Sequence, residues 1–87
     1  MPYYQIHIAI MGKTIFYHAG CPVCMSAEQE ILQLIGPEKV EIVHLGMDKS
    51  RIAEAENAGV KSVPALLTEN GNVLHINHGA TMAEVKA

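Results

Sequence analysis

The chain has 87 residues, the size of one small domain, and we treat residues 1–87 as a single unit. Apolar residues make up 49% and charged residues 17%, so we expect a globular chain rather than a disordered one. The formal net charge of -3, with only six lysines and arginines, argues against nucleic acid or an anionic membrane surface as a partner.

We expect neither a membrane-spanning helix nor a secretory signal in this sequence. No apolar run approaches the 18 residues that a membrane-spanning helix needs. The N-terminus lacks the basic region of a secretory signal, so we expect an intracellular, cytoplasmic protein in a reducing compartment. In such a compartment, two cysteines are expected to be redox-active or metal-binding rather than a structural disulfide.

The first predicted element is a strand over residues 3–11. Its apolar members alternate with the others along the chain: Tyr4, Ile6, Ile8 and Ile10 against Tyr3, Gln5, His7 and Ala9. Only Gly12 and Lys13 separate it from the next β-prone run, which is too short a link for a parallel crossover. Residues 1–12 are therefore expected to be an extra N-terminal strand or extension. We expect it to lie along a sheet edge, or to pair with a second copy in a homodimer that leaves Cys21 free.

The central stretch runs from Thr14 to Cys24, where a β-prone run is followed by a short break and a Cys-x-x-Cys motif. This order predicts strand, loop and helix start. Two thiols three residues apart in the first helical turn can form a disulfide with little backbone movement. Unpaired N–H groups and the helix dipole favour a thiolate at Cys21, and Pro22 suits the first helical position. Cys21 is thus the candidate nucleophile, with Cys24 shielded and placed to resolve.

A helix is predicted from Pro22 to Gly36, because apolar residues recur at intervals of three and four. Residues 40–45 then form an apolar run of strand length. A strand–helix–strand passage of this kind predicts a right-handed parallel βαβ unit. Asp48 is expected to cap a second helix, which should end before Gly59.

The C-terminal part predicts a β-hairpin followed by a short helix. Pro64 precedes the strand at residues 65–68, and Asn70-Gly71 predicts a type I′ turn into a strand that starts at Val73. Gly79-Ala80 is expected to break this last strand, and Thr81 to cap a closing helix. The histidines in the apolar strands are expected to be partly buried and structural, and we assign them no role: His7, His44 and His75.

Taken together, these motifs resemble the thioredoxin-like superfamily. Cys21-Pro22-Val23-Cys24 stands at the family's active-site position, and Val63-Pro64 stands at its cis-proline position. The resemblance implies an α/β thioredoxin-like fold: a central mixed β-sheet flanked by helices, with a C-terminal β-hairpin and a short last helix. It also implies a thiol-disulfide oxidoreductase with Cys21 as the nucleophile and Cys24 as the resolving thiol.

The resemblance further implies a substrate site around Cys21. An extended substrate segment would pair beside Val63 and Pro64, with Pro22 next to it. We also count His18 among the residues of this site, either beside the substrate or as a polar neighbour that modulates the pKa of Cys21; it could also simply sit at the strand end. The expected partners are a disulfide-containing protein or a small thiol substrate, and either a reductase or glutathione as electron donor. No cofactor is expected other than glutathione acting as the reductant.

The chain also departs from the family patterns. Gly20 replaces the tryptophan that precedes the first cysteine in thioredoxins, and Pro22-Val23 replaces their Gly-Pro. Gly79-Ala80 stands where glutathione-binding glutaredoxins have Gly-Gly or Gly-Cys followed by acidic residues. These departures leave the electron donor open between glutathione and a reductase.

A different class of function also fits the same residues. His18 lies three residues before Cys21, so that His18, Cys21 and Cys24 could supply three zinc ligands. The alternative is a zinc-binding or redox-sensing module that uses these three side chains without turnover. Since no fourth ligand is evident, the oxidoreductase with no bound metal is the main prediction.

Overall fold

The structure is a computed structural model, and it describes residues 13–87. Its elements follow one another along the chain in this order: β1 (Thr14–His18), α2 (Pro22–Ile35), β2 (Val40–His44), the 3₁₀ helix η1 (Lys49–Arg51), α3 (Ile52–Ala58), β3 (Ser62–Leu67), β4 (Val73–Thr81) and α4 (Met82–Lys86). The strand predicted at residues 3–11, with its edge or dimer contact, lies outside the described residues. Within residues 13–87, no helix combines the length and apolar character needed to cross a bilayer.

The described strands form one mixed sheet in the order β2-β1-β3-β4. β1 and β2 are parallel, in a register that sets Thr14 opposite Val40 and His18 opposite His44. β3 is antiparallel to both β1 and β4. The predicted parallel βαβ unit and C-terminal hairpin are therefore both correct. Because β1 and β2 run in the same direction, the loops that follow them meet at one end of the sheet.

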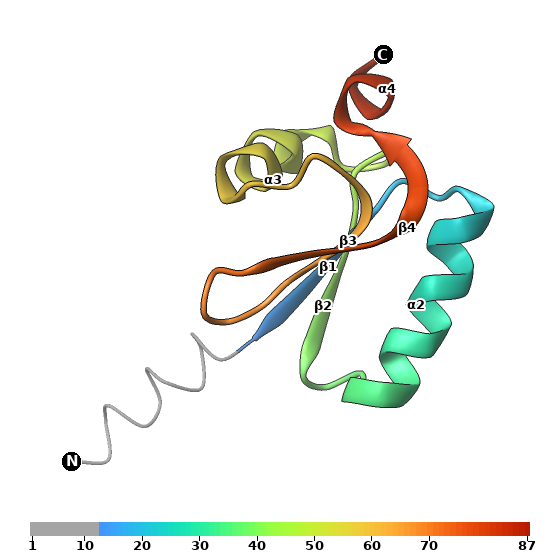
Figure 1. Cartoon of the computed structure of the whole chain (residues 1–87), viewed down its shortest axis with the longest axis vertical. Coiled ribbons are helices and arrows are strands. Elements are labelled where there is room, and N and C mark those ends of the chain that lie inside the picture. The colour runs from blue at the N-terminus through green and yellow to red at the C-terminus, as the bar shows by residue number, and fades with distance from the viewer. Residues whose placement is uncertain (1–12) are drawn as a thin grey trace.

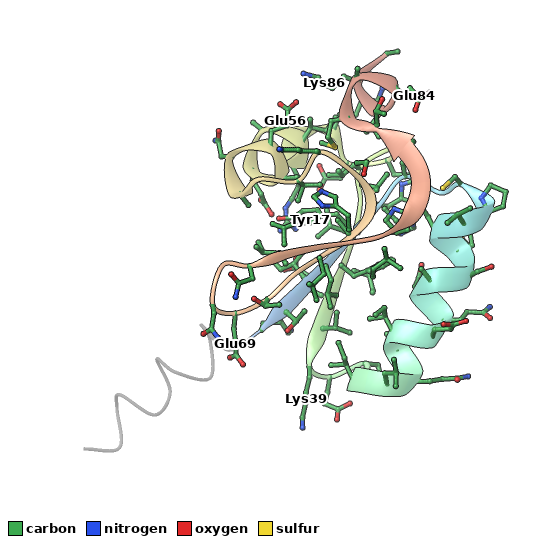
Figure 2. All side chains as sticks on the ribbon, in the orientation of Figure 1. Tyr17, Lys39, Glu56, Glu69, Glu84 and Lys86 are labelled. Carbon is green, nitrogen blue, oxygen red and sulfur yellow. The ribbon has the colours of Figure 1, made fainter. Side chains whose placement is uncertain are left out.

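The helices cover both faces of the sheet (Figure 1). Phe16 and Tyr17 are neighbours on β1, so they point to opposite faces, and both are fully buried. Phe16 packs in a cluster with Ile31 of α2, whereas Tyr17 packs in a cluster with Ala55 of α3 and Val85 of α4. Thus α2 covers one face, and α3 with α4 covers the other. Figure 2 shows Tyr17 between the sheet and α3.

The second helix begins later than predicted. Asp48 takes the N-cap position of η1 rather than of α3, and its side chain makes no capping hydrogen bond. The Asp48 carboxylate instead accepts a hydrogen bond from the Ser50 hydroxyl at 2.5 Å. α3 therefore starts at Ile52 after one 3₁₀ turn. Its predicted end is correct, since Gly59 adopts the left-handed conformation, with φ of 103°.

The β3–β4 hairpin is present, but the predicted type I′ turn is wrong. The Gly71 N–H donates to the Thr68 carbonyl at 2.9 Å, so Glu69 and Asn70 occupy the centre of the turn. Gly71 follows them with φ of 88°. The Thr68 hydroxyl also accepts from the Asn72 N–H at 3.1 Å, which favours this longer loop over a two-residue turn.

β4 does not break at Gly79-Ala80 as predicted. The ladder is irregular between Val63 and Ala65, but pairing resumes with Val63 opposite Ala80, so the strand continues to Thr81. Thr81 then caps α4 as expected: its hydroxyl accepts from the Glu84 N–H at 3.2 Å, and its own N–H donates to the Glu84 carboxylate at 2.8 Å.

Candidate redox site

The cysteine pair sits at the start of α2, as predicted. Cys21 is the N-cap residue, in extended backbone conformation, and Pro22 opens the helix. The Cys21 sulfur accepts a hydrogen bond from the Cys24 N–H at 3.3 Å, and the two sulfur atoms lie 2.8 Å apart. Both cysteines are free thiols. The pair is thus close enough to form a disulfide with only a small shift.

The two thiols differ in exposure. Cys21 is half-buried, whereas Cys24 has no exposed surface. Burial, followed by the hydrogen bond to Cys21, raises the pKa of the Cys24 thiol to about 11. At neutral pH, Cys24 therefore keeps its proton beneath the more accessible Cys21 sulfur.

Three segments meet at Cys21. The Val63–Pro64 peptide bond is cis, as the resemblance implied, and both side chains are buried. Gly79 of β4 closes the third side, since a β-carbon at this position would lie 2.7 Å from the Cys21 sulfur and 2.7 Å from the Val63 carbonyl oxygen. The structure thus brings Cys21, Val63 and Pro64 together, and any contact of Val63 with substrate must be through its backbone.

Gly79 was not predicted as a site residue. The sequence was interpreted as a strand break at this position, because glycine disfavours strands. A glycine inside a strand can also mark a close approach of another chain segment, and this was the signal that could have identified it. The extended β4 carries Gly79 to the end of the sheet where Cys21 lies.

His18 lies beneath the active-site loop rather than on its surface. It is 3% exposed, so the predicted contact with substrate is wrong: the ring is covered by protein. Its Nδ1 accepts a hydrogen bond from the Gly20 N–H at 3.2 Å, and its Nε2 lies 3.5 Å from the Glu28 carboxylate on α2. Burial, followed by the neighbouring His44, lowers the pKa of His18, while Glu28 opposes this shift.

His44, to which we assigned no role, packs against His18. The parallel register sets the two histidines opposite each other, and their ring centroids lie 4.5 Å apart. Gly20 and Gly46 lie against the His44 ring, because β-carbons at these positions would come within 2.6 and 2.9 Å of it. His44 Nδ1 also accepts from the Met47 N–H at 3.2 Å. The ring therefore joins the loops that follow β1 and β2.

His75 differs from the prediction of a partly buried histidine. It is exposed, because β4 is an edge strand of the described sheet. Its Nε2 accepts a hydrogen bond from the Lys61 N–H at 3.0 Å. This bond links β4 to the loop before β3.

The zinc alternative finds no support in the geometry. In the part of the chain that the structure describes, no three His, Cys, Asp or Glu side chains converge as a metal ion requires. The nitrogens of His18 face Gly20 and Glu28, so the predicted set of His18, Cys21 and Cys24 does not form.

A polar network on the opposite face was not predicted. The Tyr17 hydroxyl donates to the Glu54 carboxylate at 2.6 Å, and Arg51 bonds to both Glu54 and Glu41. Burial, with Glu54 next, raises the pKa of Tyr17, whereas the bond from Arg51 lowers the pKa of Glu54. The network ties η1 and α3 to β1 and β2.

A mixed sheet with a Cys-x-x-Cys pair at a helix N-terminus beside a cis-proline defines a thioredoxin-like protein. No protein-family model and no curated protein matches the chain. Among solved structures, the chain is similar to a dimeric thioredoxin-like protein from Nitrosomonas europea, determined by NMR in solution. The two are 64% identical over 86% of this chain and 95% of that one, with a TM-score of 0.77. The chain therefore belongs to the thioredoxin-like proteins, and the predicted fold class is confirmed.

Proposed function

We propose that this protein is a thiol-disulfide oxidoreductase acting in the cytoplasm, where it contributes to cell redox homeostasis. One observation carries the proposal: an accessible Cys21 sulfur lies 2.8 Å from a buried Cys24 sulfur at the start of α2. A pair with no function would not require this asymmetry. Dithiol chemistry does, because one thiol must meet the substrate while the other waits beneath it.

The reaction proceeds in two exchanges. The Cys21 thiolate attacks one sulfur of a substrate disulfide, and the other substrate sulfur leaves as a thiolate. Cys24 then gives up its proton to the departing sulfur and attacks Cys21, which releases the second substrate thiol. The product is a reduced substrate and a Cys21–Cys24 disulfide, with two electrons transferred to the substrate. The raised pKa of Cys24 keeps it protonated until this second step.

The substrate is proposed to approach from the side where Pro22, Pro64 and Gly79 surround Cys21. Pro22 is exposed on this side, and the backbone of Val63 lies beside the cysteine sulfur. An extended substrate segment can pair with such backbone like an added strand. His18 acts from beneath as a positioning residue, because its ring accepts the Gly20 N–H and so holds the loop that leads to Cys21.

The oxidised pair must be reduced again, and we propose that glutathione or a reductase supplies the electrons. Both donors deliver two electrons to a Cys21–Cys24 disulfide by thiol exchange. Regeneration assays separate them: one contains reduced glutathione, and the other contains a thioredoxin reductase with NADPH. The donor that reduces the Cys21–Cys24 disulfide faster, at equal protein concentration, is assigned as the electron donor.

Trapping tests the function itself. Cys24→Ser should accumulate a mixed disulfide between Cys21 and a model protein disulfide, detected by mass spectrometry. Cys21→Ser is the matched control and should form none. Wild-type protein should reduce the same disulfide with turnover when dithiothreitol is present. No trapped species with Cys24→Ser, from a protein whose circular dichroism shows it folded, would refute the proposal.

We also propose that the chain forms a homodimer. The support is the protein from Nitrosomonas europea, which is described as dimeric and shares 64% identity with this chain. The predicted contact through residues 3–11 lies outside the described residues, and it stays a prediction.

A further inference from the structure

An apolar groove runs between α2 and the sheet, on the face opposite α3. It has a volume of about 610 Å³. Val23, Ile31 and Leu34 line it from α2, and Leu66, Leu74 and Ile76 line it from β3 and β4. Glu30 is the one charged residue among the described residues of its wall.

The groove is open because the last helix does not cover it. α4 has only five residues, and Met82 and Val85 pack into the cluster on the α3 face. The Lys86 ammonium also pairs with Glu56 of α3 at 2.9 Å, and Figure 2 shows the two labelled side chains near each other. Within residues 13–87, β4 is the edge of the sheet beside the groove. No described element therefore lies over this wall.

Two leucines stand exposed on the rim of the groove. Leu34 is 80% exposed on α2, and Leu74 is 53% exposed on β4. The face thus carries both a hollow and protruding apolar side chains. Such a face can pack against itself about a two-fold axis, with the rim of each copy entering the hollow of the other.

We propose that this groove is the contact surface between two copies of the chain; this inference rests on the proposed homodimer. The low charge of the wall makes this face compatible with a second copy. Each chain carries a net charge of -3, so two copies repel each other through most pairs of faces. At the groove the two copies would meet through a wall that carries one charged residue, Glu30.

The arrangement also affects access to the active site. The groove begins at Pro22 and Val23, directly after Cys21. A second copy in the groove therefore lies beside the cysteine on the α2 side. Pro22, which flanks the proposed substrate site, also lines the groove, so the second copy covers that flank and leaves Cys21 approachable from the side of Pro64 and Gly79.

Sedimentation of full-length variants tests the surface. Leu34→Glu and Leu74→Glu each place a charge on the rim, and both should convert a dimer of twice 9.4 kDa to a monomer of 9.4 kDa. We expect the dissociation constant to rise by roughly 30-fold or more, because the rim of each copy enters the hollow of the other and a charge on the rim would be buried there. Met47→Glu is the matched control, because Met47 is 83% exposed outside the groove and the charge change is the same. Met47→Glu should remain dimeric.

The N-terminal contact is tested alongside by Ile8→Glu in the full chain. The groove proposal expects Ile8→Glu to remain dimeric. It is overturned if Leu34→Glu and Leu74→Glu remain dimers, whether Ile8→Glu is a monomer or a dimer. A monomeric wild type overturns both the dimer and the groove contact. Disulfide reduction is measured on the same samples, so that the activity of Cys21 is tested independently of the oligomeric state. Circular dichroism checks that each variant is folded.

Discussion

Gly79 lies against Cys21 so closely that a β-carbon at position 79 would be 2.7 Å from the cysteine sulfur. The same β-carbon would be 2.7 Å from the Val63 carbonyl oxygen, which is backbone and cannot rotate away. The position of the Cys21 sulfur is therefore set by two segments that are distant in sequence. Any side chain at position 79 must displace the sulfur, the β3 backbone, or both.

Gly79→Ala should therefore slow disulfide exchange by at least about tenfold, equivalent to about 1.4 kcal/mol in the activation barrier. The control is Gly71→Ala. Gly71 has φ of 88°, so alanine there is strained, but a β-carbon would meet no atom within 4 Å. Gly71→Ala should lower stability and leave the exchange rate unchanged. Equal exchange rates for the two variants would show that Gly79 does not position the sulfur. Stopped-flow reduction of a model disulfide measures both.

Much of the fold could be predicted because short sequence motifs determine the backbone conformation of the residues around them. Such local motifs mark helix ends: the Cys-x-x-Cys motif with Pro22 at the start of α2, Gly59 at the end of α3, and Thr81 at the start of α4. Alternation and helical periodicity supplied most of the remaining elements. The start of α3 was missed because a 3₁₀ turn separates Asp48 from α3, and the Asp48 carboxylate bonds to the Ser50 hydroxyl and not to a helix N–H.

The site itself was only partly predictable. The cysteines and the proline are recognised by type and spacing, whereas His44 and Gly79 become site neighbours only through strand register. His18 faces His44 because β1 and β2 are parallel and aligned, which no local signal encodes. The burial of His18 was also missed. The sequence shows that His18 ends a strand, but it does not show that α2 packs over this side chain.

Alkylation should distinguish the two thiols. Brief treatment of the reduced protein with iodoacetamide at pH 7 should label Cys21 and leave Cys24 almost unmodified. Cys24 is fully buried, and burial raises the pKa of its thiol to about 11, so it lacks both access and thiolate character. Peptide mass spectrometry measures the ratio. A majority of label on Cys24 would reverse the assigned roles.

Tyr17→Phe should lower the free energy of unfolding by roughly 0.5–1.5 kcal/mol, the usual net value of one hydrogen bond. The change removes the hydroxyl that donates to Glu54 at 2.6 Å and leaves the ring packed in the core. Glu54 keeps its bonds to Arg51, so the loss should be no larger. Urea denaturation measures it. A loss above 3 kcal/mol would indicate that the whole network depends on the hydroxyl.

The stability of the protein should fall in mild acid because of His18. Burial and His44 lower the pKa of His18 in the folded protein below its ordinary value of 6.5. A lowered folded pKa means that the unfolded chain binds the proton more tightly. The contribution of neutral His18 is thus fully present above pH 6.5 and is lost as the pH falls through its folded pKa. Glu28 and His44 are the charged or titratable groups that face the ring.

His18→Asn is the variant that isolates this effect, because the asparagine oxygen can still accept the Gly20 N–H that His18 Nδ1 accepts. The difference in melting temperature between pH 7.5 and pH 5 should be smaller in His18→Asn than in the wild type. If acid also reaches the active-site loop through Gly20, the exchange rate of the wild type should fall more steeply with acid than that of His18→Asn. Identical pH profiles for stability would show that His18 keeps its ordinary proton affinity despite its burial.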